Sequence, residues 1–143
     1  MSARAPRAVR AVALGTVAVL GYGTVVHVVQ LVAAGSDPYP EQPGWLRLYF
    51  VALTLLDPLA AVLLYRARRS GVVLAVAVLV TDAVANAWAN YAVDDAGGLT
   101  AGRVGQAVVT LLALVLVLAS GRLWQHAGRP VRDRPHHRRP ASS

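Results

Sequence analysis

The sequence has 143 residues, of which 56% are hydrophobic and 15% are charged, and its formal net charge is +7. A soluble domain of this size needs more polar surface than that composition provides. Every basic residue other than histidine is arginine, and cysteine is absent, which excludes disulfides, cysteine zinc sites and thiol nucleophiles. The composition therefore predicts an integral membrane protein.

Four apolar stretches approach the ~20 residues that a helix needs to cross a bilayer. Segments rich in Gly, Pro, Asp or Arg separate them, as is typical of turns. The first stretch follows an arginine-rich N-terminus, so a cleaved signal peptide is the competing interpretation, but its apolar core is longer than such peptides use. We predict an all-α integral membrane four-helix bundle with spans at 11–33, 45–65, 72–93 and 104–124.

The arginines fall mainly on one side of these spans. The N-terminus, the turn at 66–71 and the C-terminal region hold most of them, whereas the other two loops hold Arg47 and Arg103 beside several acidic residues. The positive-inside rule therefore predicts that both termini are cytoplasmic in a multi-pass protein of the cell membrane. The exclusive use of arginine and the Ala/Val-rich helices resemble small membrane proteins of high-GC bacteria, which implies a bacterial plasma membrane.

The domain organisation follows from these spans. We predict a basic cytoplasmic N-terminus at 1–10, a transmembrane domain at 11–126 and a tail at 127–143. The tail is rich in Arg and Pro with few apolar residues, so we expect it to be disordered. Its charge favours contact with lipid headgroups over nucleic acid, and no nucleic-acid partner is predicted.

The third span carries the clearest polar pattern. Asp82, Asn86 and Asn90 recur every four residues and so share one helical face. Ionisable and amide groups are costly in lipid, so this face is predicted to point into the bundle. Two interpretations stay open: the amides bind neighbouring helices as packing contacts, or they line a cavity that admits water or a ligand.

Other spans add titratable groups. His27 and Gln30 lie one turn apart in the first span, and Asp57 directly precedes Pro58 in the second. Pro58 removes a backbone donor and makes room for a kink. His27 is either a neutral imidazole bonded to Asp82, Asn86 or a carbonyl, or a proton carrier. Asp57 either stabilises the kink or is a functional carboxylate.

Together these groups predict one pocket with a polar floor and hydrophobic walls, mostly in the outer half of the bundle. Two carboxyls and an imidazole suffice for acid and base chemistry, so Asp57, Asp82 and His27 are the catalytic candidates. The predicted ligand-binding residues are Gln30, Thr54, Asn86, Trp88, Asn90, Gln106 and Thr110.

Motifs of soluble enzymes do not occur in the sequence. It has no phosphate-binding loop, no nucleophile elbow, no HExxH and no dinucleotide-binding glycine motif. Too few ligands are present for an enclosed metal site. We predict no metal and no cofactor, and the sequence leaves open whether the protein is an enzyme.

The run Pro43, Trp45, Leu46, Arg47, followed by an apolar span interrupted by Pro58, resembles the EXPERA membrane family, which includes emopamil-binding protein and the sigma-2 receptor. The resemblance implies a compact bundle whose cavity accepts sterol-like or cationic amphipathic ligands. In the isomerase branch it also implies proton transfer by acidic residues and a histidine. An acidic pocket role carries over only to Asp57 and Asp82, since the family's earlier acid position holds Leu53 and Thr54 here.

Three functional hypotheses follow. The first is a protein that binds or isomerises a lipophilic small molecule such as an isoprenoid, a lipid or a sterol-like compound. The second is a structural or accessory subunit of a membrane complex, in which the polar residues serve only helix packing. The third is a proton-coupled small transporter that works as a homodimer, although transporters of that size carry their essential acid in the first helix. The partners predicted are therefore the lipid bilayer, a small lipophilic molecule, and a second copy or another membrane protein.

Overall fold

The structure is a computed structural model, and it describes residues 5–35, 38–93 and 97–128. Within these ranges the chain is all-α. The elements are α1 (Arg7–Ala34), α2 (Gly44–Tyr65), α3 (Arg69–Trp88), the π-helix η1 (Ala89–Val93) that continues α3, and α4 (Ala101–His126). Each of the four long helices is long and apolar enough to cross a membrane. The predicted fold class is confirmed to that extent.

The helices extend past the predicted spans, and local chemistry sets their ends. α1 begins directly after Pro6, whose carbonyl accepts from Arg10 N, and ends before Gly35 at a φ of 64°. Pro43 precedes α2 in extended conformation and accepts from the amides of Leu46 and Arg47. Proline suits a helix start because its missing N–H would have no partner there.

α4 has a side-chain cap. The hydroxyl of Thr100 accepts from Arg103 N, and the helix ends at His126. The first two residues of the predicted tail contact the bundle, since Ala127 is buried and Gly128 N donates to Ala67 O at 2.8 Å. The remaining predicted tail, 129–143, and residues 1–4 lie outside the described residues.

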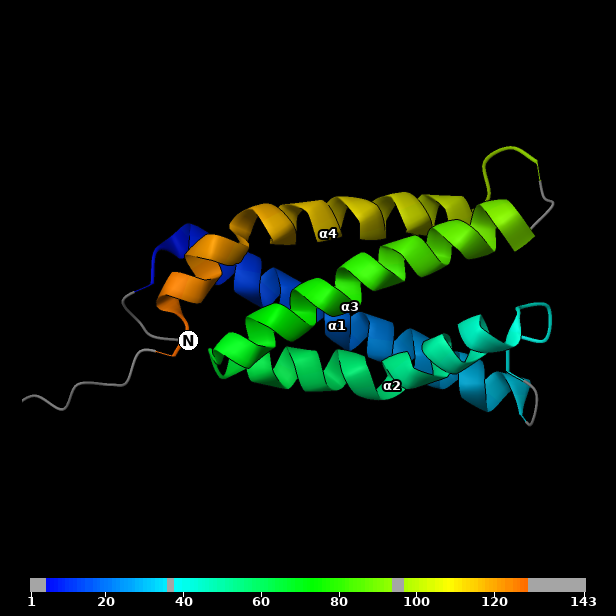
Figure 1. The fold of residues 1–143 in the computed structure, drawn as a ribbon, viewed down its shortest axis with the longest axis horizontal. Coiled ribbons are helices and arrows are strands. Elements are labelled where there is room, and N and C mark those ends of the chain that lie inside the picture. The colour runs from blue at the N-terminus through cyan, green and yellow to red at the C-terminus, as the bar shows by residue number, and fades with distance from the viewer. Residues whose placement is uncertain (1–4, 36–37, 94–96, 129–143) are drawn as a thin grey trace, which may run out of the picture.

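The helices pack in chain order, α1 on α2, α2 on α3 and α3 on α4, with a weaker contact between α1 and α4. In Figure 1, α3 crosses from the side of α2 at one end of the bundle to the side of α4 at the other. The start of α1, the turn between α2 and α3, and the end of α4 share one end, which we call the arginine end. The opposite end, with the α1–α2 and α3–α4 connections, is called the loop end. The described arginines at the arginine end are Arg7, Arg10, Arg66, Arg68, Arg69 and Arg122.

The arginine end is closed by close backbone packing. Gly71 of α3 lies against the backbone of Leu63 in α2, so near that a Cβ on residue 71 would overlap the Leu63 carbonyl. Around this contact Val9, Leu64 and Leu123 are buried. The burial of these aliphatic side chains and the close contact of α2 with α3 hold the helices together at this end.

Candidate functional site

A polar cavity of about 460 Å³ lies in the half of the bundle nearer the loop end. All four helices contribute to its wall, with most of the lining from α1, α3 and α4. The volume falls within the ~300 to 1,000 Å³ usual for small-molecule sites. Seven of the residues predicted as catalytic or ligand-binding line it: His27, Gln30, Asp57, Asp82, Asn86, Asn90 and Gln106.

Asp57 comes from the middle of α2, one residue before Pro58. Its side chain is only 5% exposed, and none of the described residues gives it a hydrogen bond. Gly23 of α1 makes room for it, since a Cβ at residue 23 would lie 2.6 Å from Asp57 Oδ2. A carboxyl group in this setting is costly unless a ligand or water binds it.

The predicted polar face of the third span is formed by α3 and η1. The amide nitrogen of Asn86 donates to Asp82 Oδ1 at 2.8 Å and to Asp82 O at 3.0 Å, and Asn90 Nδ2 donates to Asn86 O at 2.8 Å. These bonds stay within one helix, so the two amides do not join neighbouring helices. They leave the Asn86 side-chain oxygen and Asp82 Oδ2 available to the cavity.

Asn90 lies in the π-helix and is packed against α4. A Cβ at Gly102 would overlap the Asn90 side-chain oxygen. Arg103 contacts the same turn, with Nη2 donating to Asn90 O at 3.4 Å and the guanidinium lying 5.0 Å from the Tyr91 ring centroid. A π-turn leaves backbone carbonyls without regular partners, and the arginine supplies a donor there.

His27 has a partner that the sequence did not identify. Its Nδ1 is 3.2 Å from the hydroxyl of Tyr39, which donates to Gln30 Oε1 at 2.8 Å. Of the two interpretations left open for His27, the bond to Asp82, Asn86 or a carbonyl is not the one that Nδ1 forms; its partner is Tyr39. Because the tyrosine gives its one proton to Gln30, Nδ1 of His27 is the donor and Nε2 is left as an acceptor.

Tyr39 comes from the loop between α1 and α2 and lines the cavity. Its φ of 57° is left-handed, a conformation that side chains other than glycine rarely adopt. Its ring lies 5.1 Å from that of Phe50, which stacks on His27 at 6.0 Å. Burial, and secondarily the charge of Asp82, raises the pKa of Tyr39 above its ordinary value. The phenol therefore keeps its proton and remains a donor to Gln30.

Gln106 of α4 is 9% exposed and bonds across the bundle. Its Nε2 donates to Ala83 O and to Thr110 Oγ1, both at 2.9 Å, while its Oε1 is buried with no partner among the described residues. Thr110 does not line the cavity and instead holds the amide of Gln106 in place.

Two other predicted ligand-binding residues also lie outside the cavity lining. Thr54 turns its hydroxyl back to Val51 O at 2.7 Å, a bond that satisfies it within α2. Trp88 is 51% exposed on the outside of the bundle and packs edge-on against Trp45, with ring centroids 6.1 Å apart. It has the position of an interfacial aromatic residue.

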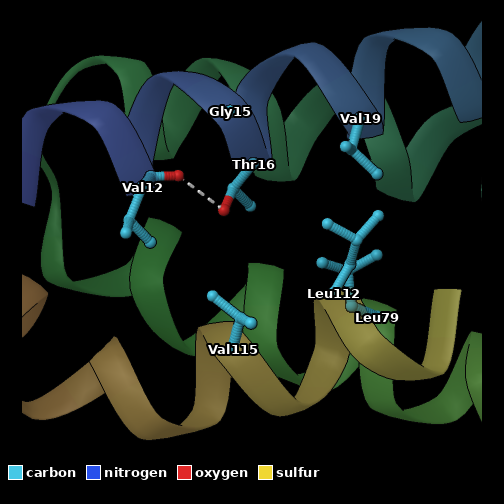
Figure 2. Close-up of a pocket in the computed structure, with 7 residues that line it drawn as sticks. All are labelled: Val12, Gly15, Thr16, Val19, Leu79, Leu112 and Val115. Atoms are coloured by element: carbon cyan, nitrogen blue, oxygen red, sulfur yellow. Dashed lines mark hydrogen bonds between the residues drawn. The ribbon is translucent and has the colours of Figure 1, made fainter. Parts of the chain in front are cut away.

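An apolar hollow of about 120 Å³ adjoins the polar cavity, because Val19 and Leu79 line both. In Figure 2, Val12 and Thr16 of α1 face Val115 of α4 across this hollow. The Thr16 hydroxyl donates to Val12 O of its own helix at 2.9 Å. The hollow extends the cavity toward the middle of the bundle with an almost wholly apolar lining.

Comparison with protein-family models, with curated proteins and with solved structures gives no match. The fold and the site therefore define a class and no family: a multi-pass helical membrane protein with a polar cavity inside its apolar bundle.

Proposed function

We propose that this protein binds a lipophilic small molecule, an isoprenoid, lipid or sterol-like compound, whose polar end carries hydrogen-bond donors. The observation that carries the proposal is Asp57: its carboxyl is 5% exposed, has no hydrogen bond from the described residues and lines the cavity. A buried polar group without a partner is costly, and a donor on a ligand would remove that cost.

The hydrogen-bond inventory of the cavity supports the same ligand chemistry. The amide nitrogen of Asn86 already donates to two acceptors, so its side-chain oxygen is what it offers a ligand. Asp57, Asp82 and the Nε2 atom of His27 add further acceptors. A hydroxyl or N–H group matches this set, whereas an ether or ester oxygen does not.

The apolar hollow supports an amphipathic shape. Its position next to Val19 and Leu79 lets a ligand with its polar end at Asp57 extend a hydrocarbon chain between α1 and α4. These two helices have the weaker contact, which leaves room for the chain. We also propose the sterol-like ligand class that the resemblance to the EXPERA family implies. Isomerisation of such a ligand would need Asp57, Asp82 and His27 to exchange protons with it.

The hypothesis of an accessory subunit, in which polar residues only pack helices, has less support. The bonds of Asn86 and Asn90 stay within α3 and η1, and Asp57 receives none from the part of the chain that the structure describes. Packing residues would instead bridge helices, as Gln106 does with Ala83. The transporter hypothesis has no carboxyl in α1 to support it.

We further propose that the arginine end is cytoplasmic and that the membrane is a bacterial plasma membrane. The arginines at that end support this orientation through the positive-inside rule. A cysteine placed at Ser70, tested with a membrane-impermeant thiol reagent in intact cells and in inverted vesicles, would react only in the vesicles.

The ligand proposal is tested with two probes that differ by one donor, farnesol and farnesyl methyl ether. Thermal unfolding of the purified protein is measured in detergent with each. Saturation at a hundredfold excess over Kd adds ~2.7 kcal/mol of stability, so farnesol is expected to raise the melting temperature more than the ether does. Asp57→Asn, which puts a donor in place of an acceptor, is expected to abolish the difference.

Thr54→Val is the matched control, because it removes a polar group from α2 without touching the cavity. It should keep the full difference between the probes. Equal shifts with the two probes in the wild-type protein, or no shift with either, would contradict the proposal.

A further inference from the structure

A second site lies on the outside of the bundle at the arginine end. It is a groove of about 460 Å³ between α3 and α4, and we call it the α3–α4 groove. Its lining is apolar apart from the indole N–H of Trp124 and the hydroxyl of Ser120, and that hydroxyl already donates to Val117 O at 2.6 Å. The lining residues are Val72, Val73, Val76, Ala77, Ser120, Gly121 and Trp124.

Small residues, Ala77 and Gly121, form part of the groove wall. Nothing lies within 4 Å of the place where a Cβ on Gly121 would stand, so the space beside α4 is open. An open apolar groove on the outer surface of a membrane-spanning bundle faces lipid tails. Hydrocarbon is thus the chemistry that fits its interior.

A cation stands at one rim of the groove. The guanidinium of Arg69, the first residue of α3, lies 5.1 Å from the centroid of the Trp124 ring, and that ring is part of the groove wall. None of the described residues forms an ion pair with Arg69. Arginine with tryptophan at the end of a span is the arrangement found at the level of lipid headgroups.

We propose that the α3–α4 groove binds an anionic phospholipid, with one acyl chain along the groove and the phosphate at Arg69. Charge complementarity selects the occupant: the rim offers a guanidinium, which binds phosphate in a bidentate manner, and the interior offers mainly apolar contacts. The site is separate from the polar cavity, with which it shares no lining residue.

The test uses Trp124 as its own reporter. The substitutions Trp45→Phe and Trp88→Phe leave Trp124 as the remaining tryptophan. The protein is reconstituted in phosphatidylcholine nanodiscs that contain an equal small fraction of brominated phosphatidylglycerol or of brominated phosphatidylcholine. Bromine on the acyl chain quenches tryptophan on contact, so the two lipids report headgroup preference in the groove.

The quenching of Trp124 should show that the brominated anionic lipid is enriched about fivefold in the groove over the brominated phosphatidylcholine. This enrichment corresponds to the ~1 kcal/mol that one arginine near the membrane surface contributes. Arg69→Gln should remove the preference, whereas Arg66→Gln should keep it, because that arginine caps α2 away from the groove. Gly121→Leu fills the groove with Arg69 intact and should also remove the preference.

Equal quenching by both lipids in the parent protein would overturn the site. A preference that survives Arg69→Gln would overturn the role of the arginine, and one that survives Gly121→Leu would overturn the role of the groove. Melting temperatures of the variants, compared with the parent, establish that each remains folded in the measurement.

Discussion

The two ends of the bundle are built in opposite ways. At the arginine end the backbones of α2 and α3 meet at Gly71, and aliphatic side chains fill the space around them. At the loop end the helix pairs separate, and acidic, amide and imidazole groups line the space between them. The first arrangement provides stability, and the second leaves polar groups such as Asp57 without a hydrogen-bond partner among the described residues.

Glycine serves a different purpose at each end. Gly71 admits backbone, whereas Gly23 admits a carboxyl group of the neighbouring helix. Close packing at one end is what allows costly unpaired groups at the other to persist, since strained or unsatisfied sites need a well-determined surrounding structure. We therefore expect substitutions at Gly71 to change stability and substitutions at Gly23 to change binding.

The largest effect is expected at Gly71. Gly71→Ala forces a methyl group into the Leu63 backbone, which has no means of moving aside, and should lower the free energy of unfolding by ~3 kcal/mol. Unfolding is measured by steric trapping or by thermal melting in detergent. Gly15→Ala is the matched control in α1, where a Cβ has nothing within 4 Å, and should leave stability unchanged or slightly raised. Equal stability of the two variants would remove the contrast between the ends.

The next effect concerns binding. Gly23→Ala places a methyl group against the Asp57 carboxyl, which can rotate away, so stability should change by less than ~1 kcal/mol. Displacement of the carboxyl should weaken the binding of farnesol about tenfold, which corresponds to ~1.4 kcal/mol. A titration followed by thermal shift measures it. Gly21→Ala, with open space at its Cβ, should bind as the wild type does; an equal loss there would mean that the position of Asp57 is not what matters.

The sequence predicted the spans well because hydrophobic length is a property of each segment alone. It also predicted that Asp82, Asn86 and Asn90 share a face, because helical periodicity follows from spacing. Seven of the ten candidate site residues line one cavity, as expected from the cost of exposing them to lipid. Whether they act on a ligand remains a prediction.

Sequence reasoning failed where the answer depended on neighbours from other elements. Tyr39 lies in a loop, between Pro38 and Pro40, and only its left-handed backbone turns it toward His27. The sequence did not predict a role for Gly102, which makes room for the Asn90 side chain. Spacing alone also could not place Thr54, whose hydroxyl binds its own helix. Such contacts depend on how helices rotate and pack against each other, and no local pattern encodes that.

The smallest effect is expected at Trp88, which tests where the cavity ends. Trp88→Phe retains an aromatic edge against Trp45, so an interaction worth ~0.5 to 1.5 kcal/mol should be largely kept, and the melting temperature should fall only slightly. Binding of farnesol should be unchanged, because Trp88 points to the outside of the bundle, opposite in role to Asp57. The same thermal-shift titration measures this. A loss of binding comparable to that of Gly23→Ala would place the ligand at the outer surface of α3 and would remove the distinction between a hollow interior and a lipid-facing exterior at the loop end.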